Sequence, residues 1–235
     1  MSNDWRRKIS RLLVGGVLLS GASLALAAQW VVVTAERTSY KSGALLDDKT
    51  PIKLAEGAQL TLLAEDGKTL KLTGPYAGVP GTSGDKGVQT NNLTAIASLL
   101  QGHRQSTSTL GVMRSFGADG ASPDPIEVDK SGEHCLMSDP VVLLRDNIAK
   151  TEEVALMDEQ GATLATFTWP ARQAELSVPA RYFEDGKRYR LQRGDRPVSL
   201  LVHKAATTPT NPTALVAWMV KQGCEAQAMR VLSKL

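Results

Sequence analysis

Short runs of alternating apolar and polar residues dominate the chain from residue 28 to residue 78. Residues 52–54, 60–62 and 70–72 each carry apolar side chains two positions apart. A period of two places the apolar residues on one face of a β-strand and the lysine or threonine between them in water. Asp66-Gly67 lies between the last two runs and is a strong hairpin signal, because glycine accepts the positive φ of a tight turn. The pattern therefore predicts an antiparallel β-meander.

A second group of short apolar runs follows between residues 126 and 206, separated by turn signals such as Asp185-Gly186. Short strands at near-regular spacing are typical of an immunoglobulin-like β-sandwich. Tyr189 enters a strand directly after that turn, as in the late corner of such sandwiches. We therefore expect Tyr189 and Trp169 in the core. The alternative is that these aromatic side chains stack on a sugar. The predicted strands cover residues 126–128, 135–137, 141–145, 154–157, 163–169, 176–178, 188–192 and 198–204.

Helical spacing appears in two places. Asn91 or Asn92 caps a short helix over residues 91–101, which Gly102 ends and whose apolar face lies on the meander. A second helical region begins at Asn211-Pro212, since proline is tolerated in the first turn, and Gly223 divides it into two helices. We expect this helix pair to fold back onto the sandwich. The alternative is that the apolar face of the helix pair is a docking surface for a partner protein.

These patterns predict a mainly β fold in five segments. They are a leader over residues 1–27, a β-module over residues 28–78, a linker with one short helix over residues 79–125, an immunoglobulin-like sandwich over residues 126–206, and a helix pair over residues 207–235.

The first 27 residues have the three parts of a secretory leader. Basic residues at positions 6, 7, 8 and 11 precede an apolar run that ends at Ala25-Leu26-Ala27. Small residues at these two alanine positions suit a signal peptidase, so we predict cleavage after Ala27 and a periplasmic or secreted protein. The alternative is an uncleaved anchor, which would then be the only membrane contact.

The leader also changes the charge of the exported chain. The whole sequence has 27 basic and 24 acidic residues, a net charge of +3. The leader holds four of the basic residues and one of the acidic ones, so the remainder is neutral. A neutral chain without a basic run has no long-range attraction for phosphate backbones, which argues against nucleic-acid binding.

Cys135 and Cys224 are the two cysteines of the sequence. In an oxidising compartment such a pair is expected to form a disulfide, and closing a loop of about 90 residues would stabilise the fold by roughly 4–5 kcal/mol. The alternative is two buried thiols that do not meet. The cysteines do not form a Cys-x-x-Cys pair, so redox catalysis is not expected.

The segment TPIKLAEGAQLTLLAEDGKTLKLTGPYAG resembles the periplasmic FecR-type domain, in which short strands alternate with glycine turns and end in a Leu-x-Gly-Pro-like corner. The similarity spans roughly residues 31–78. It implies a secreted β-module of the cell envelope. Full-length FecR proteins also carry a cytoplasmic anti-sigma segment before their membrane helix, and eleven residues leave no room for it here. The sigma-regulator role is therefore not implied.

Motifs for catalysis or cofactor binding are missing from the sequence. His103, His134 and His203 lie in separate segments, without ligand partners at the spacing of a metal site. The glycine-rich stretch 81–87 lacks the Walker spacing, and no Gly-x-Ser-x-Gly elbow is present. We therefore expect neither metal nor cofactor, and no enzymatic activity. A hydrolase with a scattered catalytic set is a third hypothesis.

The sequence favours an exported, non-enzymatic envelope protein that acts as an interaction or signalling-accessory module for an envelope or membrane protein. The alternative is a periplasmic protein that binds a glycan or small ligand in a groove between the β-modules. The candidate interaction surface consists of aromatic and aliphatic residues of the last strands and helices, namely Trp169, Trp218, Met219, Val231 and Leu235.

Overall fold

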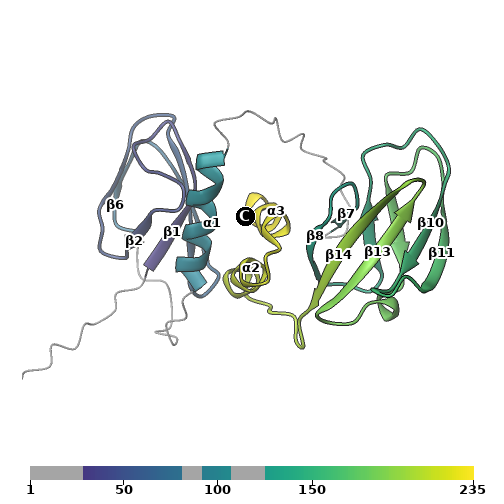
Figure 1. The fold of residues 1–235 in the computed structure, drawn as a ribbon. Coiled ribbons are helices and arrows are strands. Elements are labelled where there is room, and N and C mark those ends of the chain that lie inside the picture. The colour runs from purple at the N-terminus through teal and green to yellow at the C-terminus, as the bar shows by residue number, and fades with distance from the viewer. Residues whose placement is uncertain (1–28, 81–91, 107–124) are drawn as a thin grey trace, which may run out of the picture.

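Two β parts flank a layer of three helices in the computed structural model of the chain (Figure 1). The structure describes residues 29–80, 92–106 and 125–235. The predicted leader, the glycine-rich stretch 81–87 and the helix cap at Asn91 lie outside the described residues. The fold is mainly β, with most of its helical residues near the C-terminus, as the hydrophobic pattern predicts.

The first β part consists of a four-stranded and a two-stranded sheet. The strand order of the larger sheet is β2-β1-β4-β5, and β3 pairs with β6 in the smaller one. The predicted hairpin at Asp66-Gly67 is confirmed, because it joins the antiparallel strands β4 and β5 and Gly67 has a φ of 84°. A simple meander is not what forms, since β1 lies between β2 and β4. The strands are β1 (Gln29–Glu36), β2 (Leu45–Asp47), β3 (Ile52–Leu54), β4 (Gln59–Ala64), β5 (Thr69–Thr73) and β6 (Tyr76–Gly78).

The helical layer consists of α1 (Asn92–Ser106), α2 (Pro212–Lys221) and α3 (Glu225–Ser233). Its apolar faces share one core with the first sheet, to which β1 and β4 contribute Val31, Val33 and Leu63. Gly102 does not end α1, which continues to Ser106. An interior glycine costs about 1 kcal/mol relative to alanine, which burial of the apolar face of α1 outweighs.

The helix pair is anchored to the first β part. The predicted helix start at Asn211-Pro212 is confirmed; the Asn211 side chain accepts the N–H groups of Thr213 and Ala214, and its Nδ2 donates to Glu65 O at 3.1 Å. The buried Thr213 hydroxyl donates to Ala64 O at 2.5 Å. The expectation that the pair packs on the sandwich is therefore wrong for α2. The apolar period of a helix defines a buried face but not which sheet covers it.

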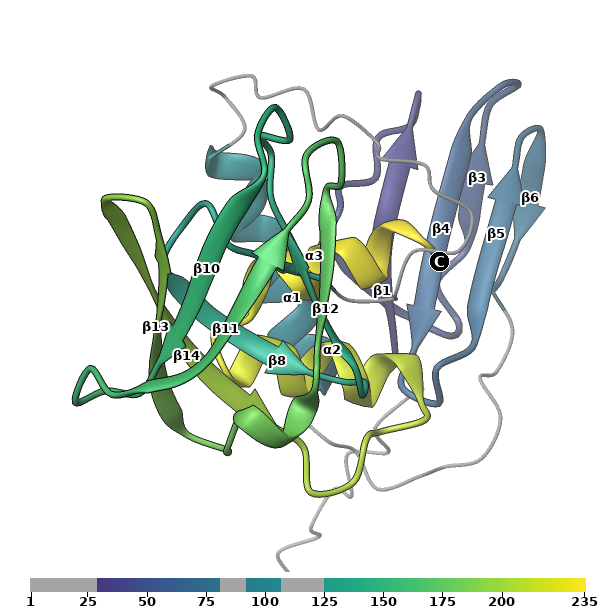
Figure 2. The same ribbon diagram turned by 90° about the vertical axis from the view of Figure 1, so that its right-hand side faces the viewer.

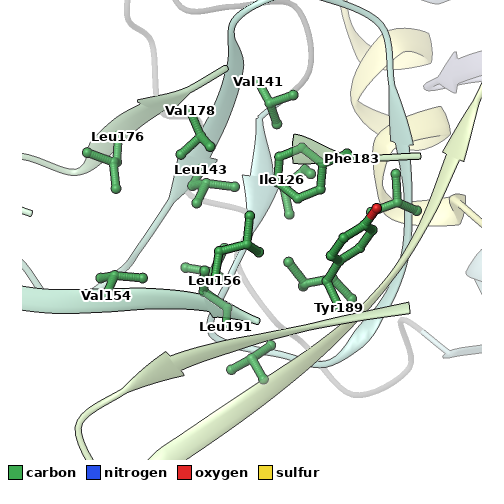
Figure 3. Packing of buried hydrophobic residues seen from close by; sticks show 14 of the residues in the cluster. Ile126, Val141, Leu143, Val154, Leu156, Leu176, Val178, Phe183, Tyr189 and Leu191 are labelled. Carbon is green, nitrogen blue, oxygen red and sulfur yellow. The ribbon is translucent and has the colours of Figure 1, made fainter. Parts of the chain in front are cut away.

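The second β part is a two-sheet sandwich with a shared apolar core (Figure 3). Its sheets have the orders β11-β10-β13-β14-β8 and β12-β9-β7. Both contain one parallel pair, β14 with β8 and β7 with β9. All eight predicted strands are confirmed, namely β7 (Ile126–Glu127), β8 (Gly132–Leu136), β9 (Val141–Leu144), β10 (Glu152–Met157), β11 (Thr163–Trp169), β12 (Glu175–Val178), β13 (Lys187–Arg193) and β14 (Arg196–Lys204).

Two neighbouring contacts join α3 to the sandwich. The predicted disulfide between Cys135 of β8 and Cys224, the residue before α3, is confirmed, with the two Cα atoms 6.0 Å apart. Beside it, Gln227 Oε1 accepts the N–H of Cys135 at 2.7 Å, and Gln227 Nε2 donates to the Cys135 carbonyl at 3.0 Å. The side-chain amide of Gln227 thus makes the two hydrogen bonds that a peptide group of a further strand would make with Cys135 of β8.

The disulfide indicates an oxidising, non-cytoplasmic compartment. Among the helices that the structure describes, none is both long and apolar enough to cross a membrane.

Replacement of both cysteines by serine should lower the free energy of unfolding by up to about 4–5 kcal/mol, because the bridge closes a long loop in the unfolded chain. Urea unfolding of the exported chain measures the loss, and reductant should reproduce it in the wild type. The double variant is the control and should not respond to reductant. Equal stability of the reduced and oxidised wild type would contradict this account.

Candidate functional site

Strand β11 forms the outer edge of the five-stranded sheet, at the end of the molecule farthest from the helices (Figure 1). In Figure 2 this side of the sandwich is turned to the viewer, and the helices lie behind it. β11 pairs with β10 along one side. Its other side forms no backbone hydrogen bond with any part of the chain that the structure describes. An edge of this kind presents free N–H and C=O groups to an added strand.

The composition of β11 distinguishes it from the other edges. Its seven residues, Thr-Leu-Ala-Thr-Phe-Thr-Trp, include no charge, no proline and no glycine. Leu164, Thr166 and Thr168 are exposed on the outer face, while Ala165 and Phe167 are half-buried on the inner face. Soluble proteins normally protect such an edge with lysine, proline, short length or a covering segment, because it otherwise pairs with other chains.

The remaining edge strands within the described ranges all carry one of these protections. β5 has Lys71 at its centre, and β12 begins with Glu175 and is followed by Pro179. β8 contains Glu133 and is covered by Gln227 of α3. β2, β3, β6 and β7 have three residues or fewer. β11 alone among them is long, uncharged and open; a one-residue bulge at Leu164 interrupts only the start of the strand, next to the turn.

A half-buried aromatic pair lies beside this edge. Phe167 of β11 meets Tyr182 edge-on, with the ring centroids 5.9 Å apart. The Arg181 guanidinium lies 4.9 Å from the centroid of the Tyr182 ring. Both aromatic side chains pack against the sandwich core without being fully buried. Apolar side chains of an added strand would therefore find an aromatic contact next to the open backbone groups.

The two ends of β11 carry opposite charges. The turn before Thr163 contains Asp158 and Glu159, whereas Lys150 and Arg172 lie at the Trp169 end, where they outnumber the exposed Glu153 of β10. Two hydrogen bonds hold the loops of that end together. Arg172 N–H donates to Ile148 O at 2.7 Å, and Ala171 N–H donates to Thr151 Oγ1 at 3.1 Å. The edge thus has an acidic end and a basic end.

Trp169 is part of the core rather than of a binding surface. Its side chain is fully buried, and its Nε1 donates to Gln173 O at 3.0 Å. The guanidinium of Arg145, itself buried, lies 4.8 Å from the Trp169 ring centroid and pairs with Glu152 at 3.1 Å. The prediction that Trp169 lies on an interaction surface is therefore wrong. These contacts also hold the Trp169 end of β11 in place.

The candidate surface on the helices is only partly accessible. Met219 is fully buried in the core between the helices and the first sheet, so its assignment to a surface is wrong. Trp218, Val231 and Leu235 are half-buried against the same core. Helical spacing places all four in apolar positions but does not say which of them reach the surface. The sequence-based prediction did not identify β11 as a site. The signal that could have indicated it is the absence of charge through a seven-residue strand.

A cavity of about 330 Å³ lies between β8 and α3, beside the disulfide. His134 lines it, and the Nε2 atom of His134 is buried without a hydrogen-bond partner. Burial, followed by the positive charge of Arg230, lowers the pKa of His134 from 6.5 to about 4. The imidazole is therefore neutral at neutral pH. The other polar side chains that line the cavity are Glu127, Lys130, Ser131, Glu133, Glu225, Gln227 and Arg230.

Comparisons with known proteins assign no relative. No protein family, no curated protein and no solved structure matches the chain.

The low pKa of His134 should make stability depend on pH. The unfolded chain binds the proton near pH 6.5, but the native chain binds it only near pH 4, so the free energy of unfolding falls between these values. The contribution of His134 to this fall is roughly 3 kcal/mol. His134→Gln should remove it, as measured by urea unfolding from pH 7 to pH 4. Carboxylates titrate equally in both chains and cancel in the difference, so identical pH profiles would contradict the assignment.

Proposed function

We propose that the chain is an exported, non-enzymatic protein-interaction module of the cell envelope that binds an extended strand at the β11 edge. The observation that carries the proposal is the open side of β11, seven uncharged residues without proline or glycine. Strand addition gains affinity from main-chain hydrogen bonds and specificity from alternate side chains. The bound strand belongs to an envelope or membrane protein, a second copy of the chain included, and the chain acts as an interaction or signalling accessory.

The proposed location is the periplasm or the extracellular space. The disulfide supports it, because such bonds persist in oxidising compartments. The three-part pattern of residues 1–27 supports export through a cleaved leader. The resemblance of residues 31–78 to the periplasmic FecR-type domain is consistent with the same location.

An immunoglobulin-like arrangement of the sandwich is part of the proposal. The hydroxyl of Tyr189 accepts the N–H of Glu184 at 2.7 Å, five residues upstream. A tyrosine that bonds back to the preceding backbone at a late corner is a feature of such sandwiches. Many cell-surface domains share this architecture. The parallel pairing of β14 with β8 departs from a purely antiparallel sandwich.

The non-enzymatic assignment is supported by the surroundings of two histidines. His203 Nε2 lies 3.8 Å from Glu133 Oε2, beyond hydrogen-bonding distance. Neither His203 nor His134 has a hydrogen-bond partner at Nε2 within the described part of the chain. A general base needs a hydrogen-bonded nucleophile or substrate within reach, and the three histidines lie in different elements.

A second candidate function is binding of a small polar ligand in the cavity between β8 and α3. The buried, unpaired Nε2 of His134 favours it, because such an atom gains from a hydrogen-bonding ligand. No tryptophan, tyrosine or phenylalanine is among the residues that line the cavity, so a glycan would lack its usual stacking partner there. The candidate is therefore a small polar molecule rather than a glycan.

A photo-reactive amino acid at position 166 should crosslink the chain to a bound protein in intact cells that export it. The same residue at Thr73, an exposed threonine of the β5 edge, is the matched control and should give no adduct. Leu164→Lys should reduce the adduct at position 166 by about tenfold, because it adds a charge to the strand edge. The adducts are identified by mass spectrometry.

Any protein joined at position 166, a second copy included, supports strand binding. No adduct, or equal adducts at positions 166 and 73, would overturn the proposed function.

A further inference from the structure

We propose that the strand bound at the β11 edge is β11 of a second copy, so that two chains form a symmetric dimer. This inference rests on the proposed function and names the occupant of the same edge. The two β11 strands would run antiparallel about a two-fold axis and join two five-stranded sheets into one. Such an interface is self-complementary, and every contact occurs twice.

The side chains of β11 fit this pairing. An axis through Thr166, the fourth of the seven residues, pairs the regular stretch 165–167 with its copy, while a one-residue bulge at Leu164 shifts the register at the start of the strand. Thr166 then faces itself, Ala165 faces Phe167, and Leu164 lies near Thr168. A small residue thus lies opposite a large one on the inner face, and two threonines meet at the axis, a favourable cross-strand pair. No like charges meet, because the strand has none.

The charges at the strand ends select the antiparallel orientation. In the dimer, Asp158 and Glu159 of one chain approach Lys150 and Arg172 of the other, and the same contact recurs at the opposite end. A parallel pair would instead place the acidic turns side by side. These four side chains form no ion pair within the described ranges, so their charges are available to a partner.

Exposed apolar side chains lie where the dimer would cover them. Leu164 is 41% exposed at the acidic end of β11, and Ile148 is 38% exposed at the basic end. They are two of the four large hydrophobic residues exposed in the described structure. The antiparallel pairing brings Leu164 of one chain to the end that carries Ile148 of the other. Apolar contacts thus accompany the backbone bonds and the charge pairs.

Sedimentation equilibrium of the chain recovered after export tests the proposal. The wild type should show a concentration-dependent equilibrium between monomer and dimer. Thr166→Lys places two lysines opposite each other at the axis and should raise the dissociation constant by more than about tenfold. Thr73→Lys makes the same change on the β5 edge and should leave the constant unchanged.

A charge exchange tests the orientation. One variant carries Glu159→Lys and Gln160→Lys, which leaves the hydrogen bond from Ala162 N–H to Asp158 intact. The other carries Lys150→Glu and Arg172→Glu. Each variant alone should be monomeric at concentrations that dimerise the wild type, since like charges then meet at both ends. The mixture should form a heterodimer, because each basic end then meets an acidic one.

Circular dichroism of all variants confirms that they fold. A wild type that remains monomeric up to millimolar concentration would overturn the dimer, as would a dimer that Thr166→Lys or the charge changes leave intact. These results leave the proposed function standing if position 166 still crosslinks to a different protein. If that crosslink is absent too, both proposals are wrong.

Discussion

The unpaired backbone groups at the edges of the five-stranded sheet are the constraint around which this structure is arranged. At one edge, β8, the disulfide from Cys135 to Cys224 brings α3 close, and the amide of Gln227 satisfies the Cys135 N–H and carbonyl. The buried side of α3 belongs at the same time to the core of the first β part. One helix therefore closes the sheet of one part and completes the core of the other.

This arrangement makes the first and last segments of the chain interdependent. The four-stranded sheet has one apolar face covered by α1 and α2, and α2 comes from the other end of the sequence. Thr213 and Asn211 bind the carbonyls of Ala64 and Glu65 near the β4–β5 turn. Loss of the C-terminal helices would thus expose both the core of the first sheet and the edge of the second.

The individual elements could be predicted from local signals. Short apolar runs separated by turn signals marked the eight strands of the sandwich, and Asn211-Pro212 and Gly223 marked the limits of α2. Pairing could not be predicted in the same way. The pairing of β3 with β6 and the packing of α2 on the first sheet depend on contacts between residues far apart in sequence. Local patterns therefore do not specify them. The Cys135–Cys224 bridge was an exception, since two cysteines in an exported chain leave one pairing.

The candidate site shows the same limit. β11 was predicted as a strand, but its place at the edge depends on the strand order of the whole sheet. The sequence pattern also allowed Trp169 to lie either in the core or on a binding surface. Its burial and its contact with the buried Arg145 place it in the core. A buried arginine carries no local sequence signal, because its partners, Glu152 and the carbonyls of Pro170 and Gln173, come from other segments.

The contrast between a closed and an open edge is the central claim, and residue-resolved amide hydrogen exchange tests it most directly. The measurement is made at a dilution at which the chain sediments as a monomer. The account predicts slow exchange at Cys135, whose N–H is bound by Gln227, and fast exchange at alternate amides along β11, whose outer side is unpaired. Fast exchange at Cys135, or uniform protection along β11 equal to that of the interior strand β13, would contradict it.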